Sequence, residues 1–387
     1  MNFFWRGLRQ LVLLPGACWA FAVCAQGEPP PPFQIVWTRG VCPHCAMARG
    51  FGGMVHATGK DLWALGYLAP GEEGSGTGTV LRSRDGGRRW RELAWTHTYP
   101  DAPLASFASA REGWIAVPDM EQAQLRLMFT RNAAAWQRMP RRELSIAAIE
   151  YLGRGTGFAA SNSGETARPA AFYATADHGR HWRQERLPAG RLLIDQMRFA
   201  NARQGYIAGC LDGRLTVLAS ADAGRHWVQT PLTAPAGDSG DSGATACSLQ
   251  ADGLLAAGDG QAWLLGVKRS FKNGDTQGEA RAWRTADGGR TWRQTYESRH
   301  AQMLDDRFIS FAGPFALGAG LIVLFKDTGD GRGQALYTSD QGQHWSAAPL
   351  PRPMASCAPA QAATRPALAC AAGIYPGFWL ATVTLGG

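Results

Sequence analysis

An eight-residue pattern, Ser/Thr-x-Asp-x-Gly-x-x-Trp, occurs five times along the 387 residues of this chain. We call these five segments the octapeptides. Their aspartate and tryptophan residues are Asp85 and Trp90, Asp177 and Trp182, Asp222 and Trp227, Asp287 and Trp292, and Asp340 and Trp345. Four fixed residue types at constant spacing do not recur five times by chance, so the chain is a repeat protein.

Each octapeptide predicts a tight turn between two antiparallel strands. The Asp carboxylate and the Ser or Thr hydroxyl can accept hydrogen bonds from backbone N–H groups just downstream. The Gly supplies a positive φ at no steric cost, and the Trp begins the next strand and can pack back across the hairpin. Five carboxylates spread one per repeat cannot converge on one substrate. We therefore interpret these residues as structural, not as catalytic acids or metal ligands.

The spacing of the octapeptides predicts a further, degenerate copy. Asp85 and Asp177 lie about twice as far apart as Asp177 and Asp222, which leaves room for one more repeat between them. The segment Thr130–Trp136 fills that place, one residue short, with Asn in place of Asp and Ala in place of Gly. A repeat of about 45 residues is typical of one four-stranded propeller blade.

The chain is therefore expected to be all-β, a single propeller of four-stranded antiparallel blades. Its 48 glycines and 15 tryptophans suit a protein with many tight turns and aromatic strands. Residues 54–351 hold six blade units, and residues 26–53 and 352–387 remain at the two ends. Strand patterns at Phe33–Trp37 and Phe378–Leu385 predict a composite seventh blade, closed by the N-terminal strand. The alternative is a six-bladed ring that these segments merely complete.

Residues 1–25 predict a cleaved signal peptide. Arg6 and Arg9 precede an apolar run, and small residues end it at Ala25. The run is shorter than the roughly 20 residues of a membrane span, and Val23 stands where a lipoprotein signal needs a small residue. We expect an exported protein, periplasmic or secreted, without a transmembrane segment after cleavage.

The net charge of +8 is scattered through the turns and forms no basic run. This pattern favours a solvated monomeric exterior and no nucleic-acid partner; anionic glycans or lipid headgroups are the alternative.

Six cysteines follow the predicted signal, an even number that predicts disulfides in an exported chain. They are Cys42, Cys45, Cys210, Cys247, Cys357 and Cys370. Cys42 or Cys45 could bridge to the C-terminal pair, or each pair could close locally. Cys210 and Cys247 fall in neighbouring blade units and could join them.

The segment Cys42-Pro43-His44-Cys45 has the spacing of a thiol oxidant, but no βαβ pattern surrounds it. A soft ligand set that would suit copper(I) gathers in the same region. It comprises Cys42, His44, Cys45, Met47, Met54 and His56. We expect no cofactor, with copper binding or thiol exchange as the alternatives to a structural disulfide.

The octapeptide is the Asp-box, or BNR, motif, and the chain resembles the Asp-box β-propeller superfamily. One branch of this superfamily is the sialidases. A resemblance to them would imply an arginine triad, an Asp acid/base and a Tyr–Glu nucleophile pair. The Arg-Ile-Pro motif that opens this triad is absent, and Arg39-Gly40-Val41 does not match it. Glu150 and Tyr151 are adjacent, so on a strand they point to opposite faces.

The second branch comprises the photosystem II stability and assembly factor-like propellers and exported WD40/YVTN/BNR-like proteins. Phe199–Cys210 followed by Ala219–Trp227 resembles its repeat. That resemblance implies a non-enzymatic, exported scaffold that binds a protein or envelope component on its open face. The alternative is a glycoside hydrolase or glycan binder of the sialidase type. A second alternative is a metal or thiol role for Cys42–Cys45.

Overall fold

The computed structural model describes residues 30–45, 48, 50–67, 77–95, 105–119, 124–139, 146–163, 169–232, 247, 249–272, 275–301, 311–328, 330–362, 365–372 and 377–386. Over these ranges the regular structure is all β-strand. No helix in this part of the chain is long and apolar enough to cross a membrane. The predicted signal peptide lies outside the described residues.

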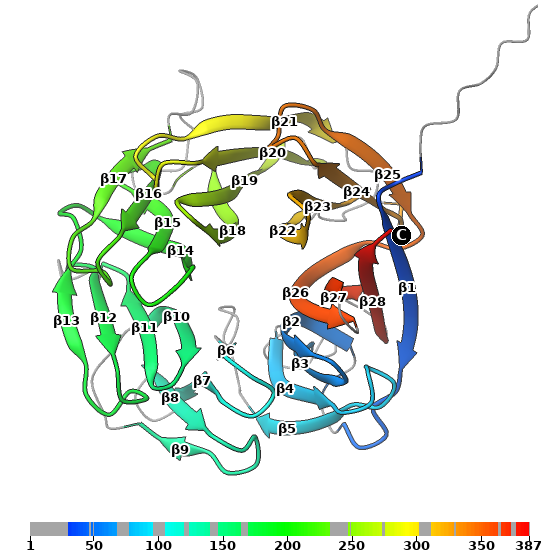
Figure 1. Cartoon of the computed structure of the whole chain (residues 1–387), viewed down its shortest axis with the longest axis horizontal. Coiled ribbons are helices and arrows are strands. Elements are labelled where there is room, and N and C mark those ends of the chain that lie inside the picture. The colour runs from blue at the N-terminus through cyan, green and yellow to red at the C-terminus, as the bar shows by residue number, and fades with distance from the viewer. Residues whose placement is uncertain are drawn as a thin grey trace, which may run out of the picture. The chain divides into compact units, whose positions relative to one another are not determined.

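The strands form seven antiparallel sheets of four strands each (Figure 1). Blade 1 comprises β2 (Gly50–Thr58), β3 (Asp61–Tyr67), β4 (Thr77–Ser83) and β5 (Arg91–Trp95). Blade 2 comprises β6 (Ala105–Phe107), β7 (Gly113–Asp119), β8 (Gln124–Thr130) and β9 (Gln137–Arg138). Blade 3 comprises β10 (Ile146–Gly153), β11 (Thr156–Ser161), β12 (Ala171–Thr175) and β13 (Arg183–Arg186). Blade 4 comprises β14 (Leu192–Phe199), β15 (Gly205–Leu211), β16 (Arg214–Ser220) and β17 (Val228–Pro231).

Blade 5 comprises β18 (Gln250–Gly258), β19 (Gln261–Lys272), β20 (Asp275–Thr285) and β21 (Arg293–Ala301). Blade 6 comprises β22 (Phe311–Gly318), β23 (Leu321–Asp327), β24 (Gly333–Thr338) and β25 (Ser346–Leu350). Blade 7 comprises β26 (Met354–Ala362), β27 (Arg365–Ala372), β28 (Phe378–Leu385) and the N-terminal strand β1 (Phe33–Gly40). In each blade the first strand in this order lies innermost, beside the central opening.

The seventh blade is composite, and the prediction of seven blades is confirmed. Strand β1 pairs with β28 along its whole length, from Phe33 opposite Leu385 to Gly40 opposite Phe378. Just beyond β1, the N–H of Val41 donates to the carbonyl of Arg88 at 2.9 Å, and the N–H of Trp90 donates to Val41 O at 2.8 Å. The N-terminal strand therefore closes the ring on two sides, against blade 7 and against the octapeptide turn of blade 1.

The octapeptides form the turns between the third and fourth strands of blades 1, 3, 4, 5 and 6. In the first, Ser83 Oγ donates to Asp85 Oδ1 at 2.8 Å and accepts the N–H of Gly87 at 2.9 Å. Asp85 Oδ1 also accepts the N–H of Arg89 at 2.9 Å. The same three bonds recur in the other four turns. These bonds satisfy N–H groups that the reversal of the chain removes from the strand ladder.

The degenerate copy in blade 2 makes the same kind of turn with one residue fewer. Ala133 N–H donates to Thr130 Oγ1 at 2.9 Å, and Asn132 Oδ1 accepts the N–H of Ala135 at 2.8 Å. Ala133 adopts a φ of 58°, a left-handed conformation that costs an alanine more than a glycine. We call residues 130–136 the shortened turn.

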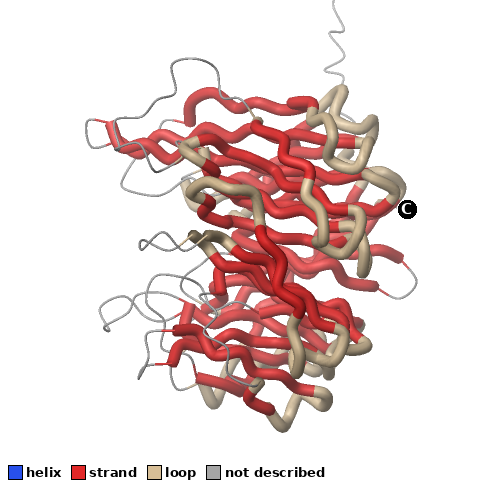
Figure 2. Tube along the Cα trace, turned by 90° about the vertical axis from the view of Figure 1, so that its left-hand side faces the viewer, coloured by secondary structure: helices blue, strands red, loops and turns tan. Residues whose placement is uncertain are grey.

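The octapeptide turns share one face of the ring with the hairpins between the first and second strands. The two are joined by backbone bonds, for example from Gly86 N to Lys60 O at 3.0 Å and from His178 N to Gly155 O at 2.9 Å. We call this edge of the blades the octapeptide face and the other the opposite face. In Figure 2 the described turns, in tan, gather mostly on the right-hand side of the ring, which is this face.

Four of the five octapeptide tryptophans also make contacts that the sequence did not predict. Their rings contact an aromatic side chain on the preceding blade, whereas Trp90 contacts Phe51 of its own blade. Trp182 lies 5.3 Å from Trp114 of blade 2, and Trp345 lies 6.2 Å from Trp263 of blade 5, measured between ring centroids. The same relation holds for Trp136 with Trp63, Trp227 with Phe172, and Trp292 with Tyr206. The motif therefore holds neighbouring blades together as well as shaping its own turn.

Candidate functional site

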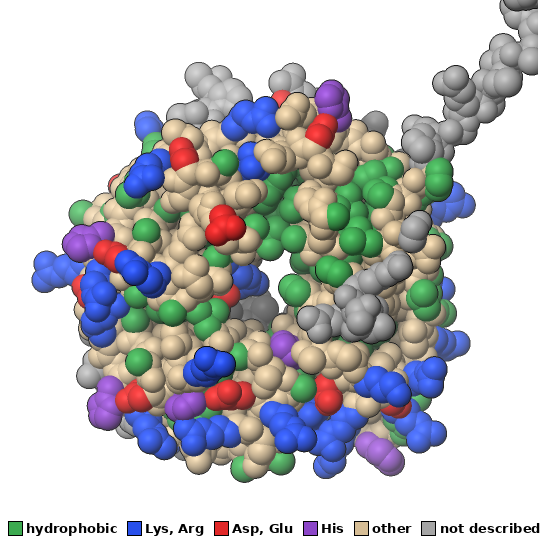
Figure 3. Space-filling view, in the orientation of Figure 1, with side chains coloured by type: hydrophobic (Ala, Val, Ile, Leu, Met, Phe, Trp, Pro, Cys, Tyr) green, Lys and Arg blue, Asp and Glu red, His purple; other side chains and the backbone are tan. Residues whose placement is uncertain are grey.

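The innermost strands carry the titratable side chains nearest the central opening, which Figure 3 shows from the octapeptide face. Glu150 lies on β10 of blade 3, and Asp195 lies on β14 of blade 4. Each carboxylate accepts a backbone N–H from the inner strand of the next blade. Glu150 Oε2 accepts Phe199 N at 2.5 Å, and Asp195 Oδ2 accepts Ala251 N at 2.9 Å.

Two serines make the same link at other junctions. Ser106 Oγ of blade 2 accepts the N–H of Tyr151 in blade 3 at 2.9 Å. Ser356 Oγ of blade 7 accepts the N–H of Met54 in blade 1 at 3.3 Å. The acceptors on the inner strands thus join one blade to the next, a structural use that was not apparent from the sequence.

Burial raises the pKa of both carboxyls. The pKa of Glu150 rises to about 7, although Arg198 and the N–H of Phe199 oppose the shift. Burial likewise raises the pKa of Asp195 to about 6, and the neighbouring Asp252 adds to the increase. Both groups therefore hold a proton at pH values where an exposed carboxylate has lost it.

We expect the Glu150→Gln substitution to remove part of the pH dependence of stability. Because the folded pKa of Glu150 lies above its ordinary value of 4.5, the folded state binds the proton more tightly than the unfolded chain does. The free energy of unfolding should then fall by about 1–3 kcal/mol as the pH rises from about 4.5 to about 7. Urea unfolding at pH 4.5 and pH 7.5 measures this. An equal fall in wild type and variant would contradict it.

Tyr151 points away from Glu150 and takes part in a separate cluster. Its hydroxyl donates to Glu112 Oε1 at 2.5 Å and lies 2.7 Å from His178 Nδ1. Burial, followed by the hydrogen bond to Glu112, raises the pKa of Tyr151 well above its ordinary value. The side chain is only 2% exposed, so the hydroxyl joins blades 2 and 3 and is not presented to a ligand. Nothing in the sequence pattern pointed to Glu112 or His178.

The octapeptide aspartates lie one per blade on the octapeptide face. The N–H of His181 is the main cause that holds the pKa of Asp177 well below its usual range. The second carboxylate oxygen of Asp177 lies 2.6 Å from His181 Nδ1, and His226 and His344 pair with their own aspartates in the same way. These carboxylates are engaged in their own turns.

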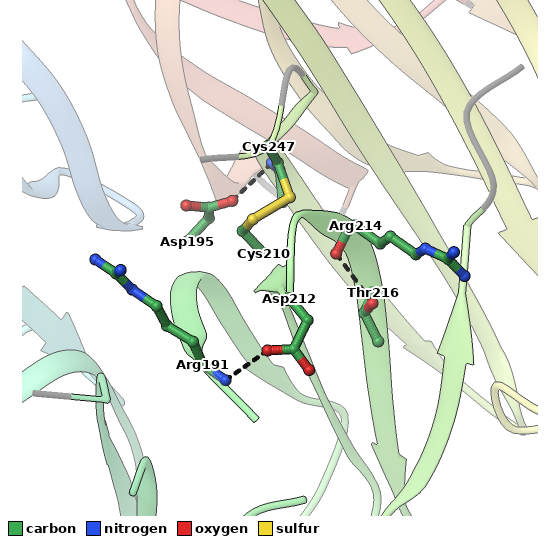
Figure 4. The surroundings of a disulfide bond; sticks show 8 residues. Arg191, Asp195, Cys210, Asp212, Arg214, Thr216 and Cys247 are labelled. Carbon is green, nitrogen blue, oxygen red and sulfur yellow. Dashed lines mark hydrogen bonds between the residues drawn. A yellow bond between two sulfur atoms is a disulfide. The ribbon is translucent and has the colours of Figure 1, made fainter. Parts of the chain in front are cut away.

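The six cysteines form three disulfides within local segments. Cys42 bonds to Cys45, and Cys357 bonds to Cys370, its direct partner on the neighbouring strand. Cys210 on β15 bonds to Cys247, just before β18, and so joins blades 4 and 5 (Figure 4). The head-to-tail bridge left open by the sequence is therefore not the pairing in this structure.

The candidate copper ligands are placed as follows. His44 lies between the bonded Cys42 and Cys45, and Met47 falls outside the described residues. His56 on β2 contacts Thr58 through Nε2 at 2.8 Å, and burial lowers the pKa of its ring. Over the ranges that the structure describes, no group of three or more His, Cys, Asp or Glu side chains is arranged to hold a metal. The expectation of no cofactor, with copper binding as its alternative, stays a prediction.

No protein-family model and no curated protein sequence matches the chain. Solved structures do resemble it in fold. A GH74 xyloglucanase from Xanthomonas campestris matches 89% of the chain with a TM-score of 0.53 and 14% identity, and the chain spans about half of that enzyme, 55%. YCF48 from Cyanidioschyzon merolae matches 90% of the chain, and 98% of its own length is covered, with a TM-score of 0.51 and 12% identity.

The WD40 domain of Toxoplasma gondii coronin is also similar. The match covers 92% of this chain and 87% of the coronin domain, with a TM-score of 0.52 and 9% identity. At these identities the likeness concerns the fold, which serves hydrolases and WD40 domains alike. By its own topology the chain is a seven-bladed β-propeller, and these likenesses agree with that fold.

Proposed function

We propose that this chain is an exported, non-enzymatic Asp-box propeller that acts as a binding or assembly scaffold in the cell envelope. The single observation that carries the proposal is the use of the inner-strand carboxylates. Glu150 and Asp195 hydrogen-bond to backbone N–H groups of the next blade, and Tyr151 is buried between blades. A sialidase-type site would instead need a carboxylate and a tyrosine free to meet substrate.

Two further observations support export and the scaffold role. Three disulfides suit an oxidising compartment, in agreement with the signal peptide read from residues 1–25. The likeness to YCF48 over almost its whole length agrees with the resemblance of the repeats to the assembly factor-like branch.

The octapeptide face is the surface we assign to the partner. Exposed arginines occupy its turns in five successive blades, and Figure 3 shows Lys and Arg side chains around its rim. These arginines are Arg84, Arg88, Arg89, Arg131, Arg180, Arg225 and Arg290. Such a surface favours a partner with an acidic patch, and its charge would speed association at low salt.

Capture from an envelope fraction tests the proposal. We expect the wild-type chain to retain one specific protein and Arg180→Glu/Arg225→Glu to reduce this by about tenfold, because both positions face the partner. Arg191→Glu/Arg214→Glu is the control, since it makes the same change of charge on the opposite face of blade 4 (Figure 4). Quantitative mass spectrometry of the eluates measures the effect.

Two results would contradict the proposal. Equal losses in the two double variants would show an unspecific charge effect and no defined partner face. Turnover of a fluorogenic sialoside by the wild-type chain would favour the alternative function, a glycoside hydrolase of the sialidase type.

A further inference from the structure

A cavity of about 470 Å³ lies at the junction of blades 1 and 2, away from the innermost strands. Its walls come from β4 and β5, from the octapeptide turn between them, and from the shortened turn of blade 2. Its volume falls within the range of small-molecule pockets, about 300–1,000 Å³. In Figure 3 Lys and Arg side chains gather at the lower rim, where these two blades meet.

The lining of this cavity is strongly basic. Four arginines, Arg82, Arg84, Arg89 and Arg91, line it together with one carboxylate, Asp85. Asp85 Oδ1 is already engaged by Ser83 Oγ and by the backbone N–H of Arg89. The side chains of Arg84, Arg89 and Arg91 are exposed, and the charge of Arg89 acts on the Asp85 carboxylate. Four guanidinium groups beside one carboxylate leave an excess of positive charge in the cavity, which an anion bound between them would offset.

Arg82 is the buried member of this group. It is 7% exposed, its guanidinium carbon lies 5.0 Å from the centre of the Trp63 ring, and Nη2 donates to Asp61 Oδ1 at 2.9 Å. Its Nε and Nη1 have no hydrogen-bond partner in the part of the chain that the structure describes. Unpaired buried donors cost stability. These two nitrogens are buried and do not face the cavity, but the charge of Arg82, held in place by Asp61, adds to the positive potential at the cavity wall.

The shortened turn distinguishes this junction from the others. In blade 3, Arg183 Nη2 donates to the carbonyl of Ala223 in the octapeptide turn of blade 4 at 2.8 Å. In blade 4, Thr230 Oγ1 donates to Gly289 O in the turn of blade 5 at 2.9 Å. Between blades 1 and 2 the corresponding turn lacks one residue, and the small Ala133 and Ala134 line the cavity instead.

We propose that this cavity binds a sugar phosphate, a ligand site beyond the scaffold role. The planar guanidinium groups match phosphate oxygens in charge and in hydrogen-bond geometry. The half-buried Trp136 at the wall presents a flat apolar surface against which a sugar ring can pack.

Isothermal titration calorimetry of the mature chain with glucose 6-phosphate, inorganic phosphate and glucose tests the site. We expect glucose 6-phosphate to bind, phosphate to bind more weakly and glucose not to bind, with affinity falling as salt rises. Arg89→Gln should weaken binding of glucose 6-phosphate by about tenfold or more, because it removes a charge-assisted contact. Arg88→Gln should change it less than about twofold, since Arg88 is exposed in the same turn but does not line the cavity.

A second pair of variants leaves the arginines unchanged and adds a carboxylate either inside the cavity or just outside it. Ala134→Glu places a carboxylate among them and should abolish binding, because the new side chain competes with the ligand for the same charges. Ala135→Glu adds the same charge at the neighbouring exposed position outside the cavity and should bind normally. Circular dichroism of each variant establishes that it is folded.

Three outcomes would overturn the proposal. No heat of binding with 10 mM glucose 6-phosphate (about the upper limit for a useful site) excludes it. Equal affinities of Arg88→Gln and Arg89→Gln place any bound anion elsewhere. Binding to phosphatidylglycerol vesicles that Arg89→Gln abolishes, with no binding of the free sugar phosphate, assigns the phosphate to a lipid headgroup instead.

Discussion

The Gly253→Ala variant is expected to lose about 3 kcal/mol or more of folding free energy, enough to leave little folded protein at physiological temperature. Gly253 lies on the inner strand of blade 5, against the inner strand of blade 6. A Cβ there would overlap the carbonyl oxygen of Gly313. Because the obstacle is backbone, no rotation of a side chain can relieve the overlap, and the two blades must separate. Thermal and urea unfolding followed by circular dichroism measure the loss.

Gly53→Ala is the matched control for this variant. Gly53 occupies the corresponding place on the inner strand of blade 1, at the same kind of register shift in the ladder. A Cβ at Gly53 would meet only the side chain of Ser356, with its hydroxyl oxygen at 3.4 Å and its Cβ at 3.6 Å, which are ordinary contacts. We expect a change within about 1 kcal/mol. If both variants were equally stable, the close approach of β18 and β22 would be refuted.

The Trp182→Ala variant is expected to lose about 3–5 kcal/mol, the usual cost of emptying a buried tryptophan site. Trp182 is 9% exposed and its ring packs on Trp114 of the preceding blade. Its Nε1 donates to Gly179 O at 2.8 Å. The substitution therefore removes contacts within blade 3 and across its junction with blade 2. Urea unfolding gives the free energy.

Trp292 has the same place in its octapeptide but a different environment. Trp292→Ala should therefore lower the free energy of unfolding by only about 1–2 kcal/mol. It is half-buried, and its Nε1 has no hydrogen-bond partner among the residues described. Its ring centroid lies 6.2 Å from that of Tyr206. Equal losses of folding free energy in the two variants, or a larger loss in Trp292→Ala, would contradict the expected dependence on the environment of each tryptophan.

The fold could be read from the sequence to an unusual degree because its repeating element is local. The bonds that the Ser83 hydroxyl and the Asp85 carboxylate make in the first turn lie within eight residues, so the residue types at fixed spacing are sufficient to predict the turn. The same argument identified the shortened turn from Asn132 and its neighbours. The preference for seven blades came instead from strand patterns at both ends of the chain, which also left a six-bladed ring open.

The candidate sites could not be read in the same way. The sequence around Glu150 does not indicate that its carboxylate accepts the N–H of Phe199. The cavity likewise depends on Arg82 and Trp136, which lie on different blades. The cysteine pairing also remained open, because local and head-to-tail bridges fit the spacing equally well. Each of these features joins residues whose distance in sequence carries no information about their distance in space.

The sequence by itself determined the turns, the blade repeat and the presence of closing strands at the two ends. The tertiary structure decided how blades meet: which aromatic ring each tryptophan contacts, which acceptor links each inner strand, and where a cavity is left. The physical reason is the distance in sequence over which each interaction acts. Turn chemistry acts within one octapeptide, whereas the bond between Ser356 and Met54 spans 302 residues and forms only once all seven blades have closed the ring.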